Sequence, residues 1–345
     1  MLAAADPRGA ANSEIASDAD WVDFNAVVST SRDQIAIAPG TLEKEWIASG
    51  RRYFHYRMDK PILNFYAFQS ARYEVRHDRW QDVTIDVYYH PGHEYNLERI
   101  VKGVKAAFEY NAKNFSPYQH KVVRIVEFPR YSNHAQSFPN TIPFSESIGF
   151  IAKVDDKNPK DIDYPFYVTA HEIAHQWWGH QLVGADTAYG QGAVGNAVRI
   201  RRPDGDEAGG GPGQDAPLPA LRPGPLPAGP RIEKKRELPL AQSERQDYLY
   251  YRKGSLAMYL LQDVIGEDKV NGVLRAAGQA CLRLGALSER GRTGGLGLRA
   301  IASAEQQYLI DDLFNAIVLY QNRAVRASAV RRADGKYVVT LTASA

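Results

Sequence analysis

Two histidines and a glutamate within five consecutive residues are the side chains of this sequence best suited to chemistry. His171, Glu172 and His175 form the pattern His-Glu-x-x-His. On an α-helix, residues four apart lie nearly above one another, so both imidazoles would project to the same side. Two neutral nitrogen ligands could then reach a single Zn²⁺, with Glu172 beside them. Zinc lowers the pKa of bound water and polarises a carbonyl group, and Glu172 would accept the proton of the water.

The residues around this pattern favour a helix. Pro165 suits a first helical turn, Asp161 and Asp163 place negative charge there, and Gly179 offers a stop. The same features would serve an ordinary amphipathic helix whose histidines are buried and hydrogen-bonded in a core. We prefer the metal interpretation because the motif and its helical context agree, and the structural alternative stays open.

A catalytic zinc usually has three protein ligands and a water molecule, so the two histidines are too few. His180 follows His175 by five residues. On a helix this places it about 140° around the axis, and it is predicted to point elsewhere. The third ligand is therefore expected from another segment.

The bulk composition is that of a globular protein long enough for two or three domains, with 345 residues and 44% hydrophobic side chains. Its 42 basic and 40 acidic side chains give a net charge of +2, which offers no reason to expect a nucleic acid partner. We find no apolar run long enough to span a membrane and no signal peptide. The single cysteine, Cys281, excludes an internal disulfide.

The first part of the chain is predicted to be rich in β-structure. Residues 27–30, 53–58 and 83–89 alternate apolar and polar side chains, as half-buried strands do. We therefore expect an antiparallel β-rich domain over residues 1–90, which serves as a scaffold.

The turn His90-Pro-Gly-His93 marks the expected boundary. Its two histidines could be metal ligands, but the sequence offers no partner motif, and a surface turn is the preferred interpretation. A strand is expected over residues 122–128. Before it, a helix is predicted over residues 94–115, because apolar side chains recur there at helical spacing: Leu97, Ile100, Val101, Val104 and Phe108.

Two stretches interrupt the second half of the chain. Residues 187–230 become rich in Gly and Pro without apolar periodicity and are predicted to be disordered, and residues 276–304 are expected to be irregular. Between them, residues 247–266 predict a helix that stops at a glycine, and residues 305–345 are expected to begin a truncated C-terminal domain. The inner face of the predicted helix would carry Leu256, Tyr259, Leu260 and Val264.

Three segments together resemble the zinc aminopeptidases of peptidase family M1, which are gluzincins. Residues 171–179 are similar to the family motif H-E-[LIV]-[AS]-H-Q-[WF]-[WF]-G, and Tyr251-Arg-Lys-Gly254 resembles its Y-x-K-G segment. Glu146 lies about 25 residues before the first histidine, where the family has a G-x-M-E-N loop, and only the glutamate matches. The subtype most similar is the bacterial one in which the peptidase domain follows an ABC-2 type permease.

The resemblance implies a role for each matched residue. His171 and His175 would hold Zn²⁺, and Glu172 would act as the general base. Tyr251 would stabilise the oxyanion, with its neighbour Tyr250 as the rival for this role. Glu146 would bind the free amino group of a peptide and so restrict cleavage to the N-terminus.

One ligand of the family pattern is missing. The family places a glutamate about 19 residues after the second histidine, where this chain has Val194, and no acid occurs between Thr187 and Arg202. Glu207 lies in the Gly/Pro-rich stretch, which is poorly suited to hold a ligand in place. We therefore interpret residues 187–230 and residues 276–304 as replaced or out-of-frame sequence.

These observations together predict an α+β protein, in which a β-rich N-terminal domain precedes a thermolysin-like, mainly helical zinc-peptidase domain over residues 91–275. The expected function is removal of N-terminal amino acids from peptides, impaired by the missing ligand. The resemblance further implies a membrane-associated bacterial protein with a permease as partner. One alternative is an inactive peptide-binding or transporter-associated module, which Val194 favours. Another is a zinc endopeptidase of a different clan with Asp186 or Glu207 as ligand.

Overall fold

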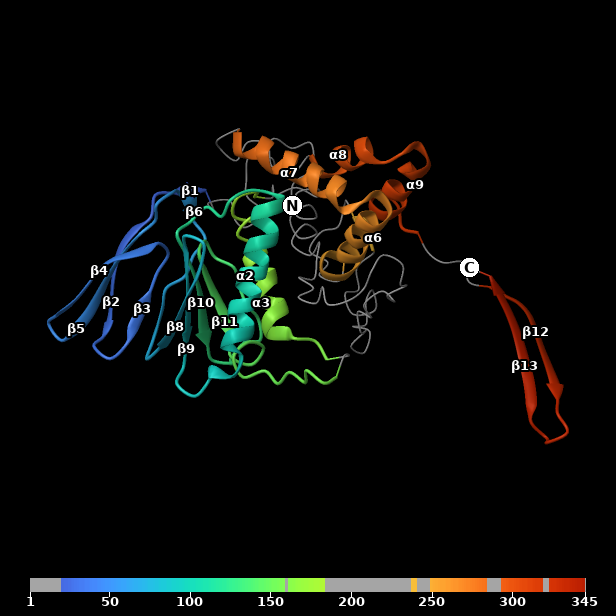
Figure 1. The fold of residues 1–345 in the computed structure, drawn as a ribbon, viewed down its shortest axis with the longest axis horizontal. Helices are drawn as coiled ribbons and strands as arrows, with labels where there is room; N and C mark the ends of the chain where they lie inside the picture. Colours follow the sequence, from blue (N-terminus) through green and yellow to red (C-terminus); the bar gives the residue numbers. More distant parts are fainter. Residues whose placement is uncertain are drawn as a thin grey trace.

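The computed structural model describes residues 20–158, 161–183, 237–240, 249–283, 293–318 and 323–344. Strands dominate the N-terminal part and helices the C-terminal part (Figure 1), which confirms the predicted α+β class. The predicted disordered stretch of residues 187–230 lies outside the described residues.

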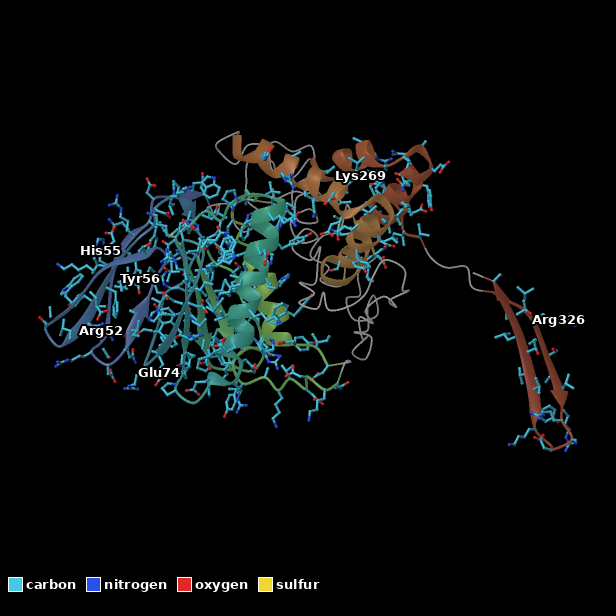
Figure 2. All side chains as sticks on the ribbon, viewed as in Figure 1. Arg52, His55, Tyr56, Glu74, Lys269 and Arg326 are labelled. Carbon is cyan, nitrogen blue, oxygen red and sulfur yellow. The ribbon has the colours of Figure 1, made fainter. Side chains whose placement is uncertain are left out.

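The N-terminal part consists of small antiparallel sheets. β2, β5 and β4 form a three-stranded sheet, and β1 pairs with β6 and β3 with β7. Alternation along β5 turns Phe54 and Tyr56 into the core, where the Tyr56 hydroxyl donates to the Ala36 carbonyl at 2.8 Å. Arg52 and His55 lie on the same strand (Figure 2). The bounds are β1 Trp21–Val22, β2 Asn25–Ser31, β3 Ile35–Ile37, β4 Thr41–Ala48, β5 Arg51–Arg57, β6 Ile62–Leu63 and β7 Gln69–Ala71.

A four-stranded mixed sheet follows, with the order β11-β10-β9-β8. β8 is antiparallel to β9, whereas β9, β10 and β11 run parallel. The hairpin β8–β9 therefore belongs to the second sheet and not, as expected, to the first domain over residues 1–90. Alternating side chains predicted the strand of residues 83–89 but carry no information about its partners. The bounds are β8 Glu74–Trp80, β9 Val83–Tyr89, β10 Val122–Phe128 and β11 Thr141–Ser145.

The helix α2 (Leu97–Asn114) follows the short 3-10 helix η1 (Glu94–Asn96) and connects β9 to β10 across the sheet. Its five predicted apolar residues are all buried, which confirms the predicted inner face. The helix α3 (Tyr164–Ala174) packs directly on α2 (Figure 1). A Cβ atom at Gly103 would lie 2.8 Å from the Phe166 carbonyl oxygen, so the close approach of these helices requires glycine there.

The C-terminal helices surround one end of this core. A π-helix η3 (Leu249–Gly254) leads into α6 (Ser255–Ile265), which ends next to Gly266, as predicted. α7 (Glu267–Arg283) and α8 (Thr293–Ile301) occupy much of the stretch expected to be irregular, so that expectation is wrong for the described residues. The many glycines and arginines of residues 276–304 obscured the helical periodicity of this stretch in the sequence. The remaining elements are η4 Ala304–Gln306, α9 Gln307–Ile310, η5 Asp311–Asn315, β12 Arg323–Arg331 and β13 Tyr337–Ser344.

The hairpin β12–β13 stands apart from the rest of the described chain (Figure 1). Arg326 marks its position in Figure 2. Strands β12 and β13 pair in antiparallel fashion. No helix in the described ranges is long and apolar enough to cross a membrane.

The predicted inner face of α6 is wrong. Leu256, Tyr259, Leu260 and Val264 are all exposed, whereas Ala257, Met258, Leu261 and Ile265 are buried. Both sets repeat at helical spacing, because this helix is apolar on more than one side, and only packing against other elements, α7 among them, decides between the two faces.

Two adjacent leucines on α6 test this orientation. Leu261 has no exposed surface, so Leu261→Ala should lower the free energy of unfolding by about 2–5 kcal/mol through a cavity. Leu260 is 39% exposed, and Leu260→Ala should cost roughly 1 kcal/mol or less. Urea unfolding of both variants measures the difference, and the opposite ranking would restore the face expected from the sequence.

Candidate functional site

The helix α3 begins as the sequence predicts and ends earlier. The Asp163 carboxylate accepts from the Phe166 amide at 3.0 Å and caps the N-terminus, with Pro165 in the first turn. The helix ends at Ala174 and not at Gly179, because His175 forms the C-cap and the chain turns away there. The second histidine of the motif therefore sits at the helix end.

The two histidines of the motif face one another. The ring centroids of His171 and His175 are 4.8 Å apart, with an angle of 83° between the ring planes, and both side chains are half-buried. Glu172 is 7% exposed. Nδ1 of His175 lies 2.9 Å from the Trp178 carbonyl oxygen and donates to it, which leaves the lone pair of a neutral imidazole on Nε2.

A buried polar network fixes the end of this helix to the segment before β11. The Gln176 side chain has no exposed surface and donates to Ser137 Oγ at 2.7 Å and to the Phe138 carbonyl at 2.9 Å. Its Oε1 accepts from the Asn140 amide at 2.9 Å. Ser137 Oγ in turn donates to the Glu172 carbonyl at 2.8 Å. These positioning residues are not predicted from the sequence, and Gln176 inside the family motif is the signal that was available.

His180 takes part in the same network as a structural residue. It is 4% exposed, and its Nε2 donates to the Ser137 carbonyl at 3.1 Å. Burial lowers its pKa to about 3, and the nearby His175 and His120 add to this effect. The imidazole is therefore neutral throughout the physiological range.

Glu146 lies immediately after β11, at the carboxyl end of the parallel strands. Its amide donates to the Phe128 carbonyl at 2.9 Å, which holds the loop against the end of β10. Its carboxylate lies 3.6 Å from Nε of Arg130, a side chain that is 72% exposed. The structure gives no contact between Glu146 and the two histidines, and the network around Ser137 links their segments through the backbone.

Two expected parts of the site fall outside the described residues. The backbone of Tyr251 belongs to η3, but its side chain is not among those described, and the same holds for Tyr250. Val194, Asp186 and Glu207 also lie outside the described ranges. The oxyanion role and the third ligand therefore remain predictions.

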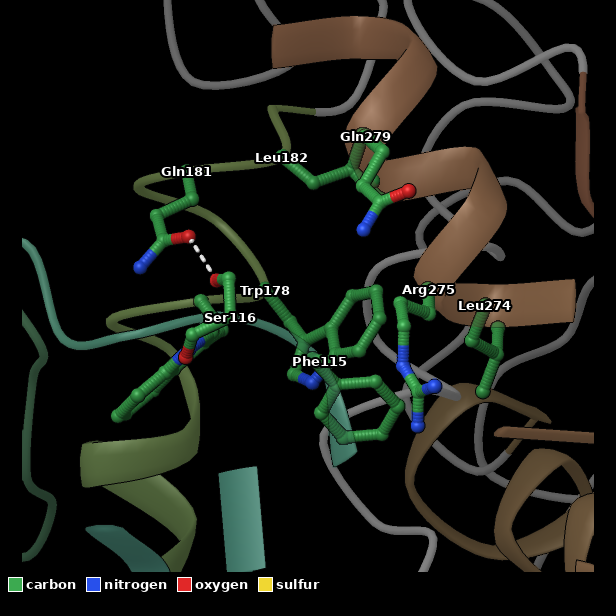
Figure 3. Close-up of a pocket in the computed structure, with 10 residues that line it drawn as sticks. Phe115, Ser116, Trp178, Gln181, Leu182, Leu274, Arg275 and Gln279 are labelled. Atoms are coloured by element: carbon green, nitrogen blue, oxygen red, sulfur yellow. Dashed lines mark hydrogen bonds between the residues drawn. The ribbon is translucent and has the colours of Figure 1, made fainter. Parts of the chain in front are cut away.

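A pocket lies between the turn after α3 and the helix α7 (Figure 3). Phe115, Trp177, Trp178, Leu274 and Arg275 contribute to its lining, and Ser116 Oγ donates to the Gln181 side chain at 2.6 Å. None of the predicted site residues lines it. The Trp rings belong to the hydrophobic core, so the pocket marks packing between helices.

The described residues fit a zinc ion in part. Two imidazoles at this separation, one oriented by a backbone carbonyl, are a suitable pair of nitrogen donors. A complete site needs a further ligand, and among the described residues no third ligand group lies with this pair.

No protein-family model and no curated protein sequence matches this chain. Solved structures do. The M1 zinc metallopeptidase from Deinococcus radiodurans is similar with a TM-score of 0.60 and 14% identity, over 88% of this chain and 65% of the other. The fold is that of the M1 zinc metallopeptidases.

Two further structures of this kind are point mutants with bound molecules. One from Deinococcus radiodurans is bound to a Tyr-Ser-Ala substrate, with a TM-score of 0.59 and 14% identity over 88% of this chain and 66% of the other. A two-domain M1 zinc metallopeptidase mutant is bound to L-tryptophan, with a TM-score of 0.58 and 13% identity over the same shares. The chain thus spans slightly less than two thirds of these relatives.

The buried imidazole of His180 predicts acid sensitivity. The pKa of His180 is about 3 in the folded state against 6.5 ordinarily, so the folded protein binds fewer protons at this site than the unfolded chain does. The free energy of unfolding should therefore be highest above pH 6.5 and fall towards pH 3, by about 1.4 kcal/mol per pH unit from this residue.

Urea unfolding at several pH values measures this contribution. His180→Gln keeps a donor for Ser137 and removes the titration, so its stability should fall less steeply with acid. His77→Gln changes an imidazole that is 73% exposed and serves as the control. Parallel profiles for the wild type and His180→Gln would contradict the prediction.

Proposed function

We propose that this chain is the core of a zinc-dependent metallopeptidase of the aminopeptidase type. The observation that carries the proposal is the pair of imidazoles, His171 and His175, facing one another at the end of a helix with Glu172 between them. The shared fold of the M1 zinc metallopeptidases supports it. So does the peptide substrate bound by one of these relatives.

In this proposal His171 and His175 hold the zinc ion, which when bound polarises the scissile carbonyl and acidifies water. Glu172 accepts a proton from the attacking water and delivers it to the leaving amine. Ser137 Oγ donates to the backbone carbonyl of Glu172, which ties this turn of the helix to the segment before β11. Tyr251 is proposed to donate a hydrogen bond to the developing oxyanion.

Glu146 is proposed to select substrates by their charge. Its carboxylate is 15% exposed, and its neighbour Arg130 extends into solvent. A peptide α-ammonium could displace this loosely held guanidinium and pair with the carboxylate. The substrate would then be bound by its N-terminus.

An inactive peptide-binding module, associated with a permease as in the subtype that the sequence resembles, is the second candidate. The specific observation that favours it is Val194 at the position where the resemblance places the third ligand. Without a charged ligand, zinc should bind more weakly and hold water less firmly. Peptide binding without zinc and without hydrolysis would support this candidate.

The general-base role can be tested by Glu172→Gln, which keeps the shape of the side chain and removes its charge. Hydrolysis of an aminoacyl-anilide should fall by about 10²–10⁴-fold, since proton transfer is lost, while zinc content stays unchanged. The control is Glu98→Gln, because the Glu98 side chain is 79% exposed and pairs with Arg76. Equal rates for Glu172→Gln and the wild type would remove the catalytic role.

The substrate anchor predicts opposite effects for two neighbouring residues. Glu146→Gln should lower kcat/KM for peptides with a free N-terminus by about 10–100-fold, the size of a charged hydrogen bond, and leave N-acetylated peptides unaffected. Arg130→Gln removes the competing cation and should lower KM or leave it unchanged. A comparable loss with both kinds of peptide would argue against the anchor.

A further inference from the structure

A second group of metal-ligand side chains lies apart from the His-Glu-x-x-His helix. The turn His90-Pro-Gly-His93 connects β9 to η1, and the His93 amide donates to the His90 carbonyl at 3.0 Å. Pro91 precedes Gly92, which has a φ of +90°, as a type II turn requires at these two positions. The turn therefore brings its first and last residues, the two histidines, to the same end of the sheet, with ring centroids 6.2 Å apart.

Glu127 is the third member of the group. It lies on β10, one residue before the strand ends, and has no exposed surface. Its Oε1 is 2.5 Å from Nδ1 of His93, and its Oε2 is 3.1 Å from Nδ1 of His90. All three ligand atoms lie within 4.8 Å of one another. A buried carboxylate with two imidazole nitrogens beside it is a donor set of the kind that binds zinc.

Hydrogen bonding alone leaves one of the two imidazoles unsatisfied. Nδ1 of His93 is hydrogen-bonded to Glu127. Nδ1 of His90 is buried and has no hydrogen-bond partner, although the carboxylate oxygen is near. The hydrogen bond between His93 and Glu127 therefore leaves Nδ1 of His90 without a partner. A single cation bound between the three side chains would instead give both nitrogens and the carboxylate a partner.

The surroundings support a metal site as well. Oε2 of Glu127 accepts from the His90 amide at 2.5 Å, and its backbone carbonyl accepts from the Tyr73 hydroxyl at 2.9 Å, so hydrogen bonds hold both the carboxylate and the backbone of Glu127 in place. The side chains of His90 and His93 are 28% and 29% exposed, which leaves a path for an ion and for water as a further ligand. Tetrahedral zinc with bonds of about 2.0–2.2 Å needs only a small separation of His93 from the carboxylate.

We propose that His90, His93 and Glu127 form a second zinc site, structural in kind and independent of the proposed catalytic zinc. Two nitrogen donors disfavour Mg²⁺ and Ca²⁺, which bind oxygen. The ion would join the turn before α2 to the end of β10. The next residue of β10, Phe128, holds the amide of Glu146 through its carbonyl. The second site would therefore stabilise the frame of the proposed substrate anchor.

Zinc content per chain tests the proposal. The full chain and its variants are equilibrated with zinc, freed of excess metal and measured by inductively coupled plasma mass spectrometry. His93→Ala and His90→Ala should each lower the content by one zinc per chain relative to the wild type, and zinc should raise the Tm of the wild type more than that of the variants. His77→Ala removes an imidazole paired with Asp86 at 2.7 Å on the neighbouring hairpin, and as the matched control it should lose none.

Combining variants of both groups tests the two proposed zinc sites separately. In a His171→Ala/His175→Ala background, one zinc per chain should remain and should be lost on adding His93→Ala. Circular dichroism verifies folding, and Glu127→Gln, which keeps the shape of the side chain, provides a second variant. Zinc content equal in the His77, His90 and His93 variants would overturn the second site, whatever the His171 variants show about the proposed function.

Discussion

The buried side chain of Gln176 is the constraint on which the arrangement of the site depends. It connects the turn after the zinc-motif helix to Ser137, Phe138 and Asn140, the residues that lead into β11. Each of these groups would cost about 1–3 kcal/mol if buried without a partner, so the helix end and the strand keep one relative position. The positions of the imidazoles at the helix end and of the loop after β11 follow from this fixed arrangement.

Local patterns in the sequence predicted the structure correctly where they allowed only one interpretation. The buried face of α2 was predicted because its apolar residues recur on a single side. The start of α3 was predicted because Asp163 and Pro165 are specific to a helix N-terminus. The pairing of His171 with His175 follows from helix geometry alone, since residues four apart must be neighbours. These features depend on near neighbours in the chain.

The features that the sequence analysis missed or assigned wrongly depend on distant neighbours. The face of α6 is set by contact with α7, and its own pattern allows two faces. The hairpin β8–β9 takes its place from β10, which follows a whole helix later. His90 and His93 were interpreted as a surface turn because their partner, Glu127, lies more than thirty residues away on a strand that is mostly apolar. A lone acid in a buried strand is the signal that could have indicated a site.

The geometry of the proposed catalytic pair and its affinity for metal have different physical origins. Helix geometry brings His171 and His175 together. The hydrogen bonds of Gln176 and the packing of the adjacent Trp177, which are parts of the folding free energy, place this pair in the fold. Zinc affinity depends on the full set of ligands, to which a charged third residue contributes strongly. If Val194 replaces the third ligand, as the resemblance implies, metal binding would be weakened without disturbing the pair. Because structural hydrogen bonds hold the zinc motif in place, the fold and the geometry of the motif can be retained when the activity is lost.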